Sequence, residues 1–423
     1  MGSISRAERR RSRREEAKGA RPEWATLEEF ARLRLQGWLQ DLLDEEITEL
    51  LGRRKSARRL TVDAEEGYRN GHGKPRRLAM TAGTVTVRRP RVRGLEARFE
   101  SRILPLFVRR TQEVAELLPQ LYLHGLAQGD FELALRGLLG EGAPLSPASI
   151  ERLRAKWTQE YAAWRTQRLD PLEVVYVWAD GLYVKAGLED TKAALLVIIG
   201  ALKDGRKVVL AVESGQREST EAWARVLRDL RARGLRPWKA TVADGHLGLW
   251  GALRAGALGD AEQRCWNHKI TNVLDHLPKK AWDAARALLR AMPYADTQAE
   301  CERRRDEFAA RYRTAYPKAV ETLERDWERM VTFYRFPKEH WTHLRTSNPV
   351  ESPFSAVRLR TDAARRYKKV ANAEALIWRL LMLAEKTFRR LNAPALLADV
   401  YAGTEFADGV AVREKKVTRG LAA

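Results

Sequence analysis

Two short runs of strand-forming residues each end in an aspartate followed by a glycine, and this pair limits the possible folds. The first run, Val174–Asp180, contains only valine, tyrosine, tryptophan and alanine before its carboxylate. The second run is Lys239–Asp244. Runs of this length and composition are typical of buried central strands. We therefore predict that Asp180 and Asp244 leave two strand ends at one edge of a sheet, whereas a simple turn at each Asp-Gly pair is the alternative.

The residues around these runs predict the remaining order of the sheet. Two further apolar runs, Ala193–Ile199 and Lys207–Ser214, are separated by a hairpin signal at residues 203–206. Apolar residues then recur at helical spacing in residues 220–233 and 247–258, and a short strand is predicted to end near residue 266. The predicted order is a meander of three strands, then a helix, a strand, a second helix and a last strand. This is the order of a ribonuclease-H-like mixed sheet. The predicted fold class is therefore α/β (mixed α+β), and residues 270–345 have an entirely helical pattern.

The charge of the chain indicates a polyanionic partner. It carries 77 Lys and Arg against 56 Asp and Glu, a formal net charge of +21. Nucleic acid is the expected partner, although a ribosome or a membrane surface would also attract such a chain. Residues 1–22 hold eight basic and three acidic residues and predict a disordered basic arm, or a tail without a role.

Residues 52–102 are the second basic segment, with fifteen Lys and Arg against five Asp and Glu. Residues 67–74 read as a glycine-rich basic loop, and residues 83–94 as an alternating strand with a basic end. We predict a small β unit that lies along DNA phosphates. Its candidate DNA contacts are Arg69, Arg76, Arg77, Arg88, Arg89, Arg91 and Arg93.

Other segments set bounds on the class of protein. Residues 114–164 have a helical pattern that suits a helix-turn-helix and an ordinary bundle equally well. No run of about 18 apolar residues is present, and the N-terminus lacks a signal-peptide core. Cys265 and Cys301 are the only cysteines, which excludes a disulfide framework. We expect an intracellular, reduced protein.

A third carboxylate, Glu351, lies in the unusual string Thr346–Ser352. Taken alone, a glutamate in the first turn of a helix is ordinary, because it complements the helix dipole. Together with Asp180 and Asp244, it would complete a set of oxygen ligands that suits Mg²⁺ or Mn²⁺. Two such ions about 3.5–4 Å apart can catalyse attack on a phosphodiester.

These motifs together resemble one family. The strand ending at Asp180, the strand ending at Asp244, residues 264–269 and residues 346–352 are similar to those of the Mutator-type DDE transposases of bacterial insertion sequences. Residues 67–71 and 87–93 also resemble that family, so the similarity spans residues 27–391. It implies a ribonuclease-H-like core interrupted by an all-helical insertion. Asp180, Asp244 and Glu351 would then be the catalytic, metal-binding triad, with two Mg²⁺ or Mn²⁺ ions.

The resemblance also implies the partners and the setting. The expected substrates are double-stranded DNA of the terminal inverted repeats and of the target, bound by a homodimer or a higher assembly in the bacterial cytoplasm, near the nucleoid. Cys265 and His268 match a family signature. We predict that His268 lies beside the metals or contacts DNA and that Cys265 is a core residue, with plain packing of both as the alternative.

Two more residues are candidates for positions near the metals or the DNA. Arg358 is seven residues past Glu351 and would share its face if the helix continues. Asn348 belongs to the same string as Glu351, and we predict that it too lies beside the metals or contacts DNA.

The predicted function is a DNA transposase that binds terminal repeats and catalyses two-metal-ion strand cleavage and strand transfer. The alternatives are a ribonuclease-H-fold nuclease or resolvase, and a non-catalytic DNA-binding protein derived from one.

The sequence predicts seven segments. They are a basic arm (1–22), a helical and small-β DNA-binding region (23–110), a helical DNA-binding domain (111–168), the first part of the core (169–269), the all-helical insertion (270–345), the second part of the core with Glu351 (346–392) and a tail (393–423).

Overall fold

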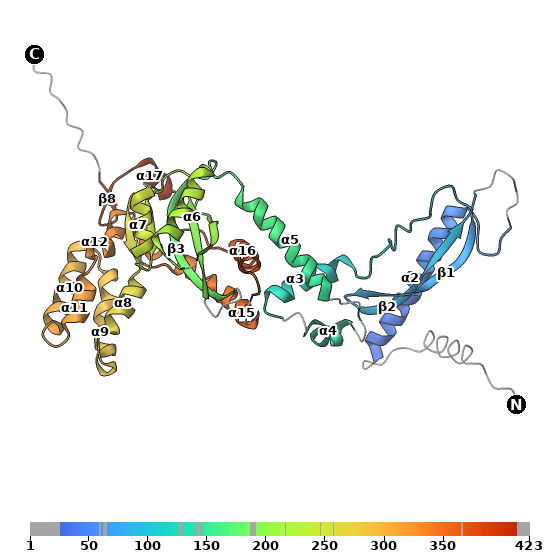
Figure 1. Ribbon diagram of the computed structural model, residues 1–423, viewed down its shortest axis with the longest axis horizontal. Helices are drawn as coiled ribbons and strands as arrows, with labels where there is room; N and C mark the ends of the chain where they lie inside the picture. Colours follow the sequence, from blue (N-terminus) through green and yellow to red (C-terminus); the bar gives the residue numbers. More distant parts are fainter. Residues whose placement is uncertain are drawn as a thin grey trace, which may run out of the picture. The chain divides into compact units, whose positions relative to one another are not determined.

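The computed structural model describes residues 26–58, 61, 66–126, 130–139, 143, 147–186, 192–215, 217–245, 247–256, 258–364 and 367–412. The predicted basic arm at 1–22 lies outside the described residues. The chain forms two compact units, Met1–Leu153 and Arg154–Ala423, and each is described by itself (Figure 1).

The first unit is built on a long helix and a hairpin. Helix α2 (Leu27–Leu51) packs against the antiparallel strands β1 (Tyr68–Met80) and β2 (Gly83–Arg93). Two glutamines of α2 complete the hydrogen bonding of β2, because Gln36 accepts from the amide of Thr86 and Gln40 bonds both backbone groups of Arg88. The small core between them consists of Leu43, Leu78, Val85, Val87 and Leu104.

The predicted glycine-rich loop at residues 67–74 is wrong, because most of this segment belongs to β1. The strand tolerates its glycines and Pro75 through two irregularities in register, between Arg69 and His72 and between His72 and Pro75. Bulges of this kind leave one residue without a ladder partner, which is how a strand can accommodate glycine and proline. Three helices follow: α3 (Gln112–Leu123), α4 (Phe131–Leu139) and α5 (Pro147–Arg165).

The second unit contains a five-stranded mixed sheet. The strands are β3 (Val174–Lys185), β4 (Lys192–Leu202), β5 (Lys207–Gly215), β6 (Ala240–Ala243) and β7 (Glu262–Arg264), and their order is β5-β4-β3-β6-β7. Strands β3, β4 and β5 form an antiparallel meander, and β6 and β7 run parallel to β3. The predicted hairpin turn between β4 and β5 is confirmed, with Gly205 at φ +84°.

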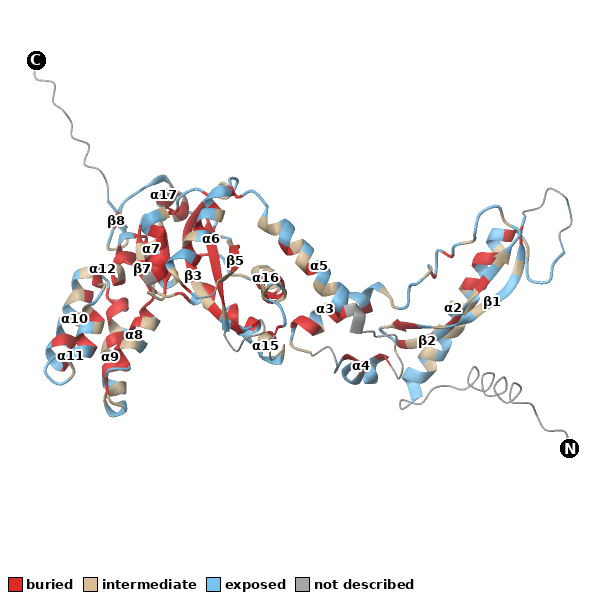
Figure 2. Ribbon diagram, in the orientation of Figure 1, coloured by how far each residue is buried: buried red, intermediate tan, exposed pale blue. Residues whose placement is uncertain are grey.

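Strand β3 does not end at Asp180, so the prediction of a strand end there is wrong. Asp180 lies opposite Val197 of β4, and pairing continues to Lys185. The hydrogen bonds of this ladder, together with the burial of Leu182 and Val184, keep the Asp-Gly pair extended. In Figure 2 the β3 ribbon is coloured mostly as buried. The alternative of a turn at this pair is excluded too.

Strand β6 does end where the sequence predicts. Asp244 follows its last residue, and Gly245 turns the chain at φ +103°. Trp178 of β3 is level with Val242 of β6 in the parallel register. Two residues further along each chain, Asp180 and Asp244 therefore come to the same level of the sheet.

The two faces of β3 contact different helices. Val177 and Ala179 belong to the core that includes Trp223 of α6 (Thr220–Ala232) and Trp250 of α7 (Leu247–Gly256). Tyr176 and Trp178 face the opposite side, where the hydroxyl of Tyr176 bonds Nδ1 of His340 and the indole of Trp178 donates to the carbonyl of His343. Since side chains alternate along a strand, Asp180 lies on this second face.

Helices and single turns fill the chain between β7 and the segment that carries Glu351. They are α8 (Trp266–Leu274), α9 (Trp282–Ala291), α10 (Gln298–Tyr312), α11 (Pro317–Glu324), α12 (Trp327–Met330) and α13 (Trp341–Leu344), with 3-10 turns at 279–281, 292–294, 332–335 and 338–340. The domain boundaries themselves stay predictions.

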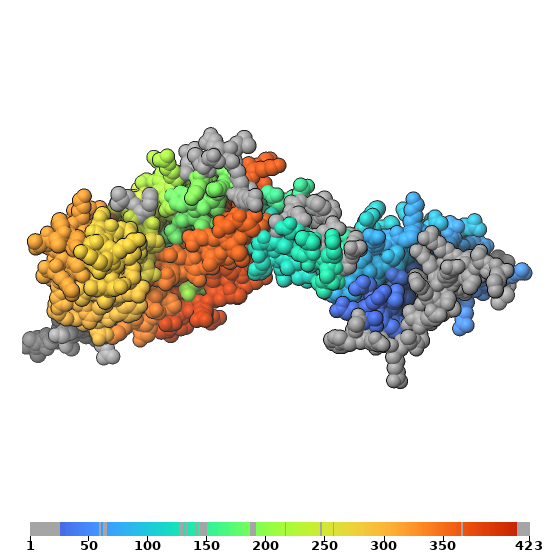
Figure 3. All heavy atoms as spheres, turned by 90° about the horizontal axis from the view of Figure 1, so that it is seen from below, coloured from blue at the N-terminus to red at the C-terminus, as the bar shows by residue number. Residues whose placement is uncertain are grey.

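The last elements return to the sheet. Helix α14 (Asn348–Glu351) contacts β3 and β4, and α16 (Val370–Glu385) contacts β5. Between them lies α15 (Phe354–Ala364), and α17 (Leu396–Ala402) and the pair β8 (Phe406–Ala407) and β9 (Val410–Ala411) follow. Figure 3 shows the orange-red surface of these later helices beside the yellow surface of the preceding helical segment. In the described part of the chain, we find no helix with the length and apolarity needed to cross a membrane.

Candidate active site

Asp180 and Asp244 form the centre of an acidic cluster at the sheet. The carboxylate of Asp180 accepts a hydrogen bond of 2.8 Å from the amide of Gly181. Burial raises the pKa of Asp180 to about 7, and the nearby charges of Asp244, Glu351 and Glu218 add to the rise. Asp180 is therefore a buried carboxyl group with other carboxylates near it.

Glu351 reaches this cluster from a single helical turn. Its carboxylate accepts a hydrogen bond from the hydroxyl of Ser347, one turn earlier. The amide of Ser347 in turn donates to the sulfur of Cys265 at 3.3 Å, and the amide of Trp266 donates to the carbonyl of Arg345 at 2.9 Å. These bonds fasten α14 to the junction of β7 and α8, which is why residues far apart in sequence meet here.

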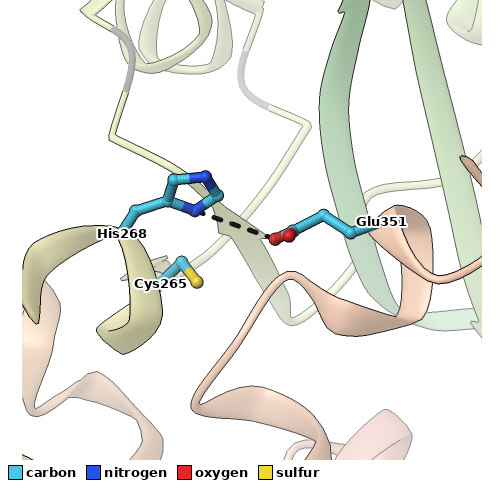
Figure 4. Close-up of side chains that lie close together, drawn as sticks. All are labelled: Cys265, His268 and Glu351. Atoms are coloured by element: carbon cyan, nitrogen blue, oxygen red, sulfur yellow. Dashed lines mark ion pairs between the residues drawn. The ribbon is translucent and has the colours of Figure 1, made fainter. Parts of the chain in front are cut away.

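His268 and Cys265 lie beside Glu351 (Figure 4). The imidazole Nδ1 of His268 is 3.7 Å from a carboxylate oxygen of Glu351. A hydrogen bond with Cys265 is the largest cause that raises the pKa of His268 to about 9, and Glu351 and Asp244 act in the same direction. The imidazole therefore carries a positive charge at neutral pH. It offsets part of the negative charge of the cluster.

The donor atoms of Cys265, His268 and Glu351 all lie within 4.8 Å of one another. They offer one sulfur, one nitrogen and one oxygen. A structural zinc site takes four ligands, and the described residues supply only these three to the group. Cys265 is fully buried at the start of α8, where sequence analysis expects a core residue.

Glu218 is a fourth carboxylate that sequence analysis missed. It is 6% exposed, and its side chain lies directly over Gly181, where an added Cβ would be 2.3 Å from Oε1. Burial and Glu218 together raise the pKa of Tyr183, which is hydrogen-bonded to that carboxylate. A single glutamate before the helix cap Ser219 has no sequence signal of its own. Only the approach to Gly181 in three dimensions reveals it.

The predicted shared face of Arg358 and Glu351 requires a continuous helix, and this condition is not met. Helix α14 ends at Glu351, and a new helix, α15, begins at Phe354. The cause is Pro353, which has no N–H to donate to the carbonyl of Pro349. Arg358 is exposed on α15. Asn348 is exposed on α14 and accepts a hydrogen bond of 3.2 Å from the side chain of Asn267.

The seven arginines predicted to contact DNA differ in their surroundings. Arg69 is turned toward α2, where it donates to the hydroxyl of Thr48 at 2.7 Å. Arg76 and Arg89 are half-buried and donate to backbone carbonyls at 2.6 and 3.3 Å. The exposed members of the set are Arg77, Arg88, Arg91 and Arg93. Their contact with DNA stays a prediction.

Comparison with known proteins identifies the family. Residues 7–390 match the model of the family described as "Transposase, Mutator family". The chain is 42% identical over 296 residues to the transposase for insertion sequence element IS6120 of Mycolicibacterium smegmatis, which covers 70% of this chain and 92% of that protein. It is 40% identical over 280 residues to the transposase for insertion sequence element IST2 of Acidithiobacillus ferrooxidans, which covers 66% of this chain and 94% of that protein. The chain belongs to the Mutator family of transposases, enzymes that cut and transfer DNA.

Proposed function

We propose that this transposase cleaves and joins DNA strands at the ends of an insertion sequence, with Asp180, Asp244 and Glu351 as its metal-binding triad. The sheet order β5-β4-β3-β6-β7, with an antiparallel meander followed by two parallel strands, supports a ribonuclease-H-like core. The substrates in this proposal are double-stranded terminal inverted repeats and target DNA. The working assembly is a homodimer or larger, in the bacterial cytoplasm beside the nucleoid.

The acidic cluster fits divalent metal ions. Carboxylate oxygens are the donors that Mg²⁺ and Mn²⁺ prefer. Burial is the main cause of the raised pKa of Asp180, and the charges of Asp244, Glu351 and Glu218 add to it. A divalent cation would relieve the part that comes from these neighbouring carboxylates. Asp180, Asp244 and Glu351 would hold the metal, in our proposal two ions. When bound, two such ions assist both the attacking and the leaving oxygen of a phosphodiester.

The protein's own groups position this chemistry. The hydroxyl of Ser347 and the charged imidazole of His268 hold the carboxylate of Glu351 from two sides. The amide of Gly181 fixes one oxygen of Asp180. Glu218, in contact with Gly181, adds negative charge beside Asp180 and so strengthens the attraction for cations. These contacts order the carboxylates before substrate arrives, which avoids an ordering cost during the reaction.

One observation carries the proposal. Asp244 is 64 positions after Asp180, and Glu351 is 107 positions after Asp244, yet both act on the pKa of Asp180. Such convergence on a buried carboxylate is typical of a functional site.

The test uses labelled duplexes that carry the ends of the insertion sequence. Asp180→Ala, Asp244→Ala and Glu351→Ala should each abolish Mg²⁺-dependent cleavage and leave DNA binding largely intact. Asp283→Ala is the control, because that carboxylate is fully exposed on α9. Retained cleavage by any of the three variants would contradict the assignment. Nicking without strand joining by the unmodified chain would favour a nuclease or resolvase instead.

A further inference from the structure

A positively charged groove lies in the first unit. Its volume is about 1050 Å³, and its walls come from the hairpin β1–β2, the segment 98–110 that follows it, and residues 143 and 152. Of its seventeen lining residues in the described chain, eight are Lys or Arg and none is Asp or Glu. A surface of this kind attracts a polyanion.

Two half-buried arginines of the groove donate hydrogen bonds to neutral groups. Arg76 donates to the carbonyl of Val108 at 2.6 Å, and Arg89 donates to the carbonyl of Phe99 at 3.3 Å. These bonds orient the guanidinium groups without neutralising them. Burial, followed by the charges of Arg89 and Arg109, lowers the pKa of Arg76, so like charges are crowded here. A bound phosphate would relieve that repulsion.

The segment that forms one wall is fastened at both ends. At its start, the hydroxyl of Ser101 donates to buried Glu46 at 2.6 Å, and Leu104 is part of the small core. At its end, the amide of Ala79 donates to the carbonyl of Arg109 at 2.9 Å, and the amide of Thr111 donates to the carbonyl of Ala79 at 3.0 Å. The residues between these anchors are therefore held on the hairpin.

Phe107 projects from this fastened segment. It lines the groove, yet it is 88% exposed. Its backbone is at φ +68°, a left-handed conformation that is strained for a bulky side chain. An aromatic ring held in water by a strained backbone and surrounded by cations indicates a ligand with a charged backbone and flat apolar faces.

We propose that this groove binds the phosphates of duplex DNA while Phe107 inserts between neighbouring base pairs and unstacks them. Apolar wedges flanked by Arg and Lys are used in this way by proteins that bend DNA. The inference rests on the proposed function, since the duplex is the DNA that this transposase acts on. It assigns the distortion of that DNA to a residue outside the acidic cluster.

The decisive variant is Phe107→Gly. Glycine adopts a positive φ without strain, so the variant removes the ring and preserves the backbone of the wall. The assay uses the full chain and duplexes of the insertion-sequence ends that carry 2-aminopurine at successive positions. The unmodified protein should raise the fluorescence of 2-aminopurine at the one base step that is unstacked. Phe107→Gly should abolish that rise, weaken binding about tenfold and leave the melting temperature nearly unchanged.

Two further variants complete the design. Phe107→Trp should restore both the fluorescence rise and the affinity, because a larger ring can still unstack the step. Trp38→Ala should change neither, since Trp38 is also exposed, at 58%, but lies on α2 and does not line the groove.

Three results would overturn the proposal: unchanged fluorescence and affinity in Phe107→Gly, a loss of binding confined to single-stranded DNA, or a loss of self-association in place of unstacking. Cleavage is scored separately with Asp180→Asn. If cleavage depends on metal and on Asp180 but unstacking does not depend on Phe107, the wedge is rejected and the catalytic assignment stands. If unstacking depends on Phe107 but no metal-dependent cleavage is found, the wedge stands and the catalytic assignment is rejected.

Discussion

The carboxyl group of Asp180 shares its surroundings with three other acidic side chains. Its pKa rises from 3.8 to about 7 in the folded chain, so the folded state binds more protons than the unfolded state between these values. Stability therefore falls as pH rises through this window, and the full penalty applies above pH 7. Without metal, the carboxylate of Asp180 costs the folded state on the order of 2–4 kcal/mol there.

Asp180→Asn removes this penalty. In EDTA, we expect the variant to melt at a higher temperature than the unmodified chain at pH 8 and at a similar temperature near pH 4, as measured by calorimetry. Asp283→Asn, on an exposed site, should show no such pH dependence. An offset of equal size at both pH values would mean that Asp180 is not the titrating group.

Gly181 tests whether Glu218 matters to the site. An alanine Cβ would be 2.3 Å from Oε1 and 2.4 Å from Cδ of Glu218, so that side chain has to move. Gly181→Ala should lower stability by about 1–3 kcal/mol and slow DNA cleavage. Gly137→Ala is the matched control, because nothing lies within 4 Å of the added atom and alanine favours its helix α4. If Gly181→Ala cleaves DNA at the normal rate, the position of Glu218 does not matter for cleavage.

Single residues also mark the limit of sequence-based prediction. The sequence singled out Asp180, Asp244 and Glu351 because each belongs to a distinctive string. Glu218 belongs to none, and only its contact with Gly181 brings it to the site. Likewise, the composition of β1 marks Arg69 as a phosphate contact, although its partners on α2 turn it inward. Tertiary partners of a charged side chain have no local signature.

Helices and strands could likewise be predicted where their signals are local, and not where they depend on distant partners. The β4–β5 hairpin and α6 are predictable because their turn glycine, apolar spacing and Ser219 cap are local. The continuation of β3 past Asp180 depends on pairing with β4, and no pattern inside β3 reveals its partner. The break between α14 and α15 coincides with Pro353, so the condition of a continuous helix, on which the shared face of Arg358 and Glu351 depended, is not met.

Helix α2 anchors the segment that carries Phe107 through one buried carboxylate. Glu46 is 7% exposed and accepts hydrogen bonds of 2.6 Å from the hydroxyl of Ser101 and from the amide of Arg102. Glu46→Ala should destabilise the first unit by about 2–3 kcal/mol, because both donors lose their partner.

Hydrogen exchange is the informative measurement for this anchor. The amides of residues 101–111 should exchange faster in Glu46→Ala than in the unmodified chain. Glu49→Ala, an exposed change on the same helix, should leave them protected. Equal exchange in both variants would show that Leu104 and the backbone hydrogen bonds with Ala79 hold the segment without Glu46.

The net charge of +21 predicts how the whole molecule responds to salt. If the eight cations of the groove each meet a phosphate, the logarithm of the affinity for duplex DNA falls with the logarithm of salt with a slope of about −7. Arg91→Ala should reduce the steepness by about 1. Arg303→Ala, on α10 with its own acidic partners, is the control and should leave the slope unchanged. A slope near zero would exclude binding through phosphates.

The distribution of the acidic cluster along the chain has a consequence during protein synthesis. On the proposed assignment, Glu351 is made 107 residues after Asp244, a delay of roughly ten seconds at ribosomal speed. The basic unit up to Leu153 is complete long before that. A product terminated before Glu351 would therefore occupy DNA without cutting it. Shortened copies of this chain should thus act as competitors that restrain the full-length enzyme.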